Sequence, residues 1–179
     1  MFSNFRMSAT TLLGRKKVED LGFICAHEHL RMNFECSFHK SKLCSEDTNM
    51  KLKNMTNHQA AMVRQFPYHF KDNLDLTDYD AVLYDLKGCS YKISSSNKSL
   101  SDYKKLGGGT ICEVSTVGLA RDPRFCAKLS EESGVNVIMG TGYYVHAAQT
   151  DATKASTVEV MNQFIQNELK YVFIYIIQF

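Results

Sequence analysis

The sequence predicts an α/β fold built on a parallel sheet. Two observations favour it: three apolar, strand-like segments are each followed by loop and helix signals, and a helix with a marked start separates the last two strands. Strand, helix, strand units with short connections form parallel sheets with right-handed crossovers. A chain of 179 residues suffices for one domain and is short for two, so residues 1–179 are predicted to be a single domain.

The first predicted strand covers residues 22–30 and ends in His27, Glu28 and His29. Side chains alternate along a strand, so the two histidines are expected on one face and Glu28 on the other. Two imidazoles so placed can share a metal ion. Zinc binds imidazole nitrogen and takes four ligands in structural sites, or three and an open position in catalytic ones. The alternative is that both histidines are polar residues where a strand meets a loop.

The second and third predicted strands cover residues 109–117 and 135–140, the second after a turn of three glycines. Between them, Asp122 is the expected N-cap of a helix and Pro123 its first residue. The helix is expected to end at Gly134, because glycine readily adopts the left-handed conformation that follows many helices.

The remaining segments are less regular. Helices are predicted for residues 59–64, 80–86 and 100–106, the last two flanking a serine-rich surface insertion at about 92–99. An amphipathic helix is predicted for residues 156–169. The apolar tail, residues 171–179, is either a buried fourth strand or an aggregation-prone one.

Composition and charge narrow the function classes. Hydrophobic residues make up 44% and charged residues 22% of the chain, as in ordinary globular proteins. A net charge of +2 is too small to favour nucleic acid or an anionic membrane as a partner. The sequence shows no secretory signal and no apolar span of 18 residues, and its six cysteines lack CxxC pairing. These features predict a cytoplasmic protein with reduced thiols.

Three motifs, in order, carry a resemblance to a known family. They are Ala26-His27-Glu28-His29-Leu30, the stretch from the glycine turn at 107–109 to Asp122, and residues 132–145, ESGVNVIMGTGYYV. Together they resemble the phosphotriesterase family of the amidohydrolase superfamily over about residues 11–169, apart from residues 94–97. The resemblance implies a (β/α)8 TIM barrel of the metal-dependent hydrolase type, present as roughly its first three β/α units.

The resemblance also implies a site and a reaction. His27 and His29 occupy the positions of the HxH pair that holds the more buried of two divalent metals, for which zinc is expected. The family's other ligands, a bridging carboxylate and residues of later strands, cannot be placed in this sequence, so no catalytic residue is assigned. The implied reaction is hydrolysis of a small-molecule ester, phosphotriester, lactone or amide by a metal-activated water.

A complete barrel typically needs ~250 residues. The predicted domain is therefore incomplete, and three alternatives to an active hydrolase stay open. The chain is a catalytically inactive truncated product, the translation of an incomplete gene model, or one half of a barrel that a partner chain completes. A homo-oligomer or a complementing chain is the expected partner.

Several other side chains have two interpretations. Cys36, His39 and Cys44 form a possible zinc cluster that lacks a fourth ligand, or belong to a variable loop. Glu113 is either a ligand or the partner of a donor in the core. Arg121 binds a substrate anion or stabilises a turn. Surface or loop roles are expected for His58, His69 and His146. The loop after the third strand contains Tyr143 and Tyr144, of which one lines a substrate pocket or both pack beneath the loop.

Overall fold

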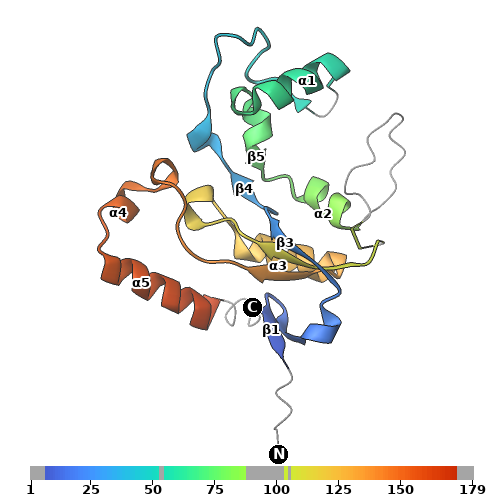
Figure 1. The fold of residues 1–179 in the computed structure, drawn as a ribbon, viewed down its shortest axis with the longest axis vertical. Coiled ribbons are helices and arrows are strands. Elements are labelled where there is room, and N and C mark those ends of the chain that lie inside the picture. The colour runs from blue at the N-terminus through green and yellow to red at the C-terminus, as the bar shows by residue number, and fades with distance from the viewer. Residues whose placement is uncertain (1–6, 53–54, 88–102, 105, 173–179) are drawn as a thin grey trace, which may run out of the picture.

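A three-stranded parallel sheet organises the chain in its computed structural model, which describes residues 7–52, 55–87, 103–104 and 106–172. The strands are β3 (Phe23–Glu28), β6 (Gly108–Glu113) and β7 (Asn136–Met139), in the order β3-β6-β7 (Figure 1). Both pairings are parallel, which confirms the predicted α/β fold. The predicted insertion at 92–99 and residues 173–179 of the tail lie outside the described residues.

Helix α3 (Pro123–Ser133) joins the last two strands as predicted. The Asp122 carboxylate accepts hydrogen bonds from the backbone N–H groups of Arg124 and Phe125. Gly134 ends the helix with a φ of 69°. This left-handed conformation is unfavourable for any residue that has a Cβ. Local sequence therefore determines both ends of this helix.

The other helices are α1 (Asn57–Gln65), α2 (Tyr79–Lys87), α4 (Asp151–Lys154) and α5 (Val158–Asn167). The prediction of a helix over residues 100–106 is wrong for its described members: Tyr103, Lys104 and Leu106 lie in turns. A tight turn explains this: Gly107 has a φ of 93°, the backbone N–H of Gly108 donates to the carbonyl of Tyr103, and the chain turns directly into β6.

Two antiparallel strand pairs were not predicted. Strands β1 (Ser8–Thr11) and β2 (Gly14–Lys17) form the first hairpin of the chain. The other pair joins β4 (Met32–Asn33) to β5 (Asp75–Leu76), which are far apart in sequence. Leu12, in the first hairpin, is fully buried, and its N–H donates to the carbonyl of Val137 on β7 at 2.8 Å. Short helical turns complete the described chain: Val18–Asp20, Glu35–Ser37, Pro67–His69, Lys71–Leu74, Val117–Leu119, His146–Ala148 and the π-helical turn η8, Glu168–Val172.

The main hydrophobic cluster, called the sheet core below, lies between the strands and helices α2 and α3. Gly109, near the start of β6, permits the backbone around Leu21 to pack closely, because a Cβ at position 109 would lie 2.1 Å from the carbonyl oxygen of Leu21. The buried members of the sheet core are Leu12, Leu30, Leu86, Ile111, Cys126, Ala127, Leu129, Val135, Val137 and Met139.

A smaller cluster lies under the long segment between β4 and α2. Its buried members are Cys44, Val63 and Phe70, with Met50, Leu52, Met62 and Phe66 packed against them. We call it the loop cluster. In Figure 1 this segment rises from β4 to α1 and returns along β5, away from α3.

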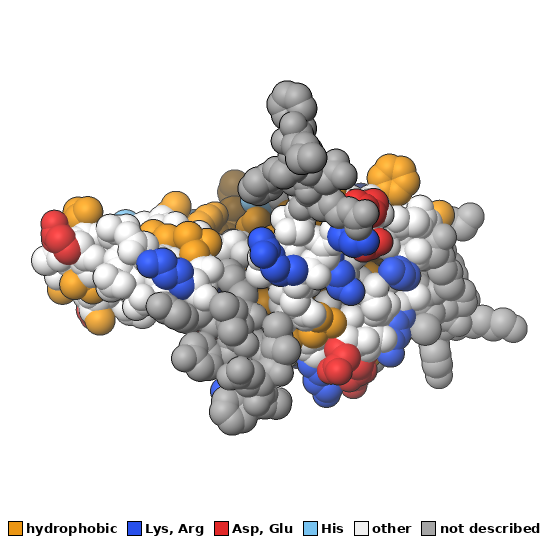
Figure 2. Space-filling view, turned by 90° about the horizontal axis from the view of Figure 1, so that it is seen from below, with side chains coloured by type: hydrophobic (Ala, Val, Ile, Leu, Met, Phe, Trp, Pro, Cys, Tyr) orange, Lys and Arg blue, Asp and Glu red, His pale blue; other side chains and the backbone are white. Residues whose placement is uncertain are grey.

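The amphipathic helix predicted for residues 156–169 is α5, yet none of its residues is buried. Val158 and Val160 are exposed, and Figure 2 shows hydrophobic side chains on the surface at the end of the molecule where α5 lies. One ring contact, between Phe164 and Tyr143 at 5.6 Å, joins the helix to the loop after β7. The apolar pattern thus predicted the helix correctly, although its apolar face is only partly covered by the described residues.

Candidate metal centre

His27 and His29 lie at the carboxyl end of β3, where the strand meets a loop. Their ring centroids are 5.5 Å apart and the ring planes are nearly perpendicular, at 82°. The pairing of β3 with β6 is irregular between Cys25 and Glu28, and β3 ends at Glu28, one residue before His29. The two imidazoles are neighbours, as the spacing predicted. His27 is exposed and His29 is half-buried.

His29 is held more firmly than a surface histidine. Its Nδ1 lies 2.8 Å from the hydroxyl of Ser115, and its backbone N–H donates to the Glu28 carboxylate at 2.9 Å. Burial and the nearby His27 lower the pKa of His29 below its usual value, opposed by Glu28. A lowered pKa keeps the ring neutral near neutral pH, and the neutral imidazole is the form that binds zinc. The pair therefore has the donor chemistry that a divalent metal such as zinc requires.

Glu113 ends β6, beside the end of β3, and is fully buried. Its carboxylate accepts the backbone N–H of Ser115, at 3.2 Å from both oxygens, and that of Leu30 at 3.4 Å. Burial raises the pKa of Glu113, while these hydrogen bonds and Arg121 act in the opposite direction. Of the two interpretations of this residue, the structure supports pairing with core donors.

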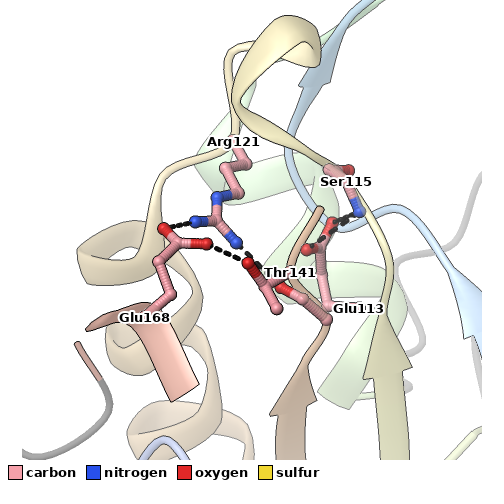
Figure 3. Close-up of polar contacts among 6 residues, drawn as sticks. Glu113, Ser115, Arg121, Thr141 and Glu168 are labelled. Carbon is pink, nitrogen blue, oxygen red and sulfur yellow. Dashed lines mark hydrogen bonds and ion pairs between the residues drawn. The ribbon is translucent and has the colours of Figure 1, made fainter. Parts of the chain in front are cut away.

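Arg121 and Glu168 form a buried ion pair next to this carboxylate (Figure 3). Only 5% and 7% of their side chains are exposed. Arg121 also donates to the carbonyl of Gly140 at 2.8 Å, and the hydroxyl of Thr141 donates to Glu168. The pair therefore ties the loops after β6 and β7 to η8, and of its two interpretations the structure supports the stabilising one for Arg121.

Sequence reasoning missed Ser115 and Glu168. Ser115 bonds to His29 across 86 positions, so only the register of the sheet brings the two together. Glu168 directly follows α5 and is buried. The sequence indicated it only as an acidic residue at the end of an amphipathic helix pattern.

The remaining candidates have structural roles. The rings of Tyr143 and Tyr144 pack against Phe164 and Phe34. His69 is buried rather than on the surface: its Nδ1 accepts the N–H of Ser41, and its Nε2 donates to the carbonyl of Glu46.

The two other histidines lie at or near the surface. His58, on α1, faces the Glu46 carboxylate at 3.7 Å, and His146 is exposed at the start of a short helical turn. Five cysteines in the described part of the chain are free thiols: Cys25, Cys36, Cys44, Cys112 and Cys126.

Within the described residues, no group of three or more His, Cys, Asp or Glu side chains is placed to hold a metal ion. The possible zinc cluster of Cys36, His39 and Cys44 is therefore wrong. The three side chains do not form a site because Cys44 is buried in the apolar loop cluster while Cys36 is exposed. The same described residues bring two potential ligands together at the end of β3, His27 and His29.

Comparison with known proteins identifies the family. The sequence matches the phosphotriesterase family over residues 7–172. The chain belongs to the phosphotriesterase family. Members of this family are metal-dependent hydrolases. None of the described helices has both the length and the apolar character needed to cross a membrane.

Relatives in the phosphotriesterase family include the N-acetyltaurine hydrolase of Xenopus tropicalis, 35% identical over 164 residues, which cover 89% of this chain and 41% of that protein. The phosphotriesterase-related protein of Drosophila persimilis is 34% identical, over 89% of this chain and 42% of its own length. The chain thus spans about two fifths of the relatives that it matches.

Solved structures show the same fold. A resiniferatoxin-binding protein from Rhodobacter sphaeroides superposes with a TM-score of 0.76 at 23% identity, over 90% of this chain and 41% of its own. The phosphotriesterase homology protein of Escherichia coli gives 0.53 at 17% identity, over 85% of this chain and 37% of its own. The predicted TIM-barrel fold is confirmed: the described strands and helices form part of such a barrel.

Proposed function

We propose that this chain carries the first part of a metal-dependent hydrolase site, in which His27 and His29 bind one divalent metal. The observation that carries the proposal is the pair of neighbouring imidazoles at the carboxyl end of β3, with rings 5.5 Å apart. Active sites of TIM barrels lie at this end of the strands. A bound zinc ion would supply a water of lowered pKa and a Lewis acid for the substrate oxygen.

The residues of this chain have separate tasks in that site. His27 and His29 would hold the metal through neutral ring nitrogens, and Glu113 would hold the ends of β3 and β6 together through Leu30 and Ser115. Zinc needs at least three protein ligands in catalytic sites. The other donors must therefore come from residues outside the described part, in this protein or in a second chain.

Esters, phosphotriesters and small amides are the proposed substrate class. Several relatives carry the name N-acetyltaurine hydrolase, which describes cleavage of an N-acyl amide, so a small N-acyl amide is the first substrate to assay. Substrate choice in this fold depends on the loops after the strands, and fold alone does not determine it.

Metal binding tests the proposal directly. The purified chain is titrated with Zn²⁺ while the ring signals of its histidines are followed by NMR. We expect the signals of His27 and His29 to shift together, and His27→Ala or His29→Ala to abolish that response. His58→Ala is the control, because His58 is exposed on α1 and its neighbour is the Glu46 carboxylate. A zinc response that persists without His27 and His29 would exclude this site.

A completing chain is the second candidate, favoured by the exposed edge of the sheet. Phe23 and Ile24 on β3 are 77% and 48% exposed, which is unusual for large apolar side chains of a barrel strand. We propose that further strands of the same barrel type cover this edge. Mixing the chain with the remaining portion of the Xenopus tropicalis relative should increase the zinc retained after dialysis, and an unchanged zinc content would count against it.

A further inference from the structure

The first hairpin lies against one edge of the sheet. Among the described strands, β7 pairs with β6 alone, so its other side is an edge. Backbone groups of a strand point alternately to its two sides. The N–H of Gly140, directly after β7, donates to the carbonyl of Glu113 on β6 at 2.8 Å, so Val137 and Met139 face the edge. In Figure 1 the hairpin lies below the strands, and β1 contacts β7.

Leu12 occupies part of that edge. Its backbone N–H donates to the carbonyl of Val137 at 2.8 Å. Strand β7 has four residues, and only Val137 and Met139 present their backbone groups to the edge. One hydrogen bond therefore takes one of the two carbonyls to which a further strand would bond. The Leu12 side chain is fully buried in the sheet core, so it also fills space beside β7.

The sequence at the tip of the hairpin holds Leu12 in this position. Leu12 and Leu13 form the two-residue loop between Thr11 and Gly14, which pair across the hairpin. The Thr11 hydroxyl donates to the Gly14 carbonyl at 2.7 Å and accepts the N–H of Leu13 at 3.3 Å. Gly14 has a φ of 106°, which residues with a Cβ rarely adopt. Leu13 is 44% exposed, so the two leucines of the tip point in different directions.

The chain that follows the hairpin is anchored to the same sheet. The Thr110 hydroxyl on β6 donates to the carbonyl of Leu21 at 2.6 Å. The Asn136 side chain, at the start of β7, donates to the carbonyl of Asp20 at 3.4 Å. Strand β2 itself carries three successive basic residues at positions 15–17. Basic side chains near a sheet edge are one means by which proteins prevent pairing with another chain.

We propose that the hairpin tip is an autoinhibitory contact, in which Leu12 blocks the addition of a strand to the edge of β7 by a second copy of this chain. A second copy is the expected partner because β7 reads NVIM, an apolar and uncharged strand, and such segments pair with their own kind. The inference concerns self-association and does not rest on the proposed metal site.

Gly14→Ala loosens the hairpin without changing the sheet core. A Cβ at position 14 would meet no heavy atom within 4 Å, so the substitution acts through the backbone conformation. We expect the amide of Leu12 to exchange with solvent about tenfold faster, from the free-energy cost of a left-handed residue with a Cβ. Gly134→Ala is the matched control, since that glycine also has a positive φ and open space around its Cβ position but ends α3.

Amide exchange at several protein concentrations tests the inference, together with sedimentation. The N–H of Met139 faces the edge, so an added strand would protect it. We expect its exchange rate to be independent of concentration in the unmodified chain and in Gly134→Ala. In Gly14→Ala we expect larger species, and slower exchange at Met139 by up to about threefold for each tenfold rise in concentration, as mass action requires for a dimer.

Three results would contradict the inference. Concentration-dependent protection of Met139 in the unmodified chain would show that Leu12 does not block the edge. A Met139 rate that ignores concentration in Gly14→Ala, although the Leu12 amide exchanges faster, would show that the edge accepts no strand. Association of Gly14→Ala that protects only the amides of β3 would place the contact at the other edge.

A second pair of variants decides the question if Gly14→Ala does not fold or leaves the hairpin unchanged. Leu12→Ala removes the buried side chain of the tip, and Leu13→Ala removes its exposed neighbour. We expect concentration-dependent protection of Met139 in Leu12→Ala alone. The same behaviour in both variants, or in neither, would overturn the role of Leu12.

Discussion

The sheet core and the loop cluster are both buried, but they are assembled in different ways. Among the residues that the structure describes, the sheet core has ten buried members, drawn from the first hairpin to β7. The loop cluster has three such members, and all of them lie within residues 44–70. Burial of apolar surface stabilises both, by about 25 cal/mol per Å². The larger cluster joins distant parts of the chain, whereas the smaller one stabilises one segment.

The difference predicts two levels of stability within one chain. Local segments with few buried contacts open with smaller free energies than the core to which they are attached. The loop cluster is held to its own segment by His69, whose two ring nitrogens bond to the backbone of Ser41 and Glu46. We therefore expect the segment around His69 to open without unfolding of the sheet core. The candidate metal centre lies at the end of the sheet, where the buried Glu113 and Ser115 hydrogen-bond to Leu30 and His29.

The largest expected effect comes from the buried ion pair at the sheet ends. Arg121→Ala leaves Glu168 buried without its partner, and we expect the free energy of unfolding to fall by about 3–5 kcal/mol. Chemical denaturation measures this. Lys128→Ala is the control, since that lysine is exposed and its pair with Glu132 should contribute about 0–1 kcal/mol.

A double variant sharpens this prediction. Arg121→Met combined with Glu168→Leu removes both charges, so much of the lost stability should return if an unpaired buried charge is the cause. A double variant as unstable as Arg121→Ala would instead assign the loss to the hydrogen bonds with Gly140 and Thr141.

The second prediction compares truncations in the two clusters. Leu129→Ala removes a fully buried side chain of the sheet core, and we expect about 2–5 kcal/mol less stability of the whole fold. Phe70→Ala creates a cavity in the loop cluster, and we expect faster amide exchange at Ser41 with a smaller change in global stability. Equal changes in global stability for both variants would show that the two clusters unfold together.

The same contrast explains how much could be predicted from the sequence. The strands, α3 and the histidine pair have local signals: apolar runs, the N-cap Asp122 and the period of two in His27 and His29. In the loop cluster the helix around residues 59–64 has such a signal, but no periodic pattern distinguishes Cys44 and Phe70 from other apolar loop residues. The first hairpin was missed for the same reason.

Local sequence patterns also could not predict which residues hydrogen-bond to the candidate metal centre. Ser115 reaches His29 only through the pairing of β3 with β6, and the irregular register before Glu28 shifts which residues lie side by side. The zinc interpretation of Cys36, His39 and Cys44 was one of two that the sequence left open, and it lacked a fourth ligand. It fails because Cys44 is buried in the loop cluster while Cys36 is exposed.

The third prediction uses one native thiol in each cluster. Cys44 and Cys126 are both buried, and burial raises the pKa of the Cys126 thiol, which suppresses its reactivity further. We expect a thiol reagent to label Cys44 at least about tenfold faster than Cys126, which corresponds to about 1.4 kcal/mol. Mass spectrometry of digested samples gives both rates, with exposed Cys36 as the reference. Equal rates at Cys44 and Cys126 would mean that one opening event exposes both clusters.

The smallest effect concerns two helix caps, one in each region. Asp122 caps α3 against the sheet core, and Thr56 caps α1 in a capping box with Gln59. Replacing either cap by alanine should cost about 1 kcal/mol locally, because the first-turn N–H groups lose an acceptor. The two losses should differ in extent. Asp122→Ala should lower the free energy of global unfolding, whereas Thr56→Ala should mainly accelerate amide exchange in α1. If Thr56→Ala instead lowers global stability as much as Asp122→Ala does, then α1 and the loop cluster unfold with the sheet, and loop and metal centre form one cooperative unit.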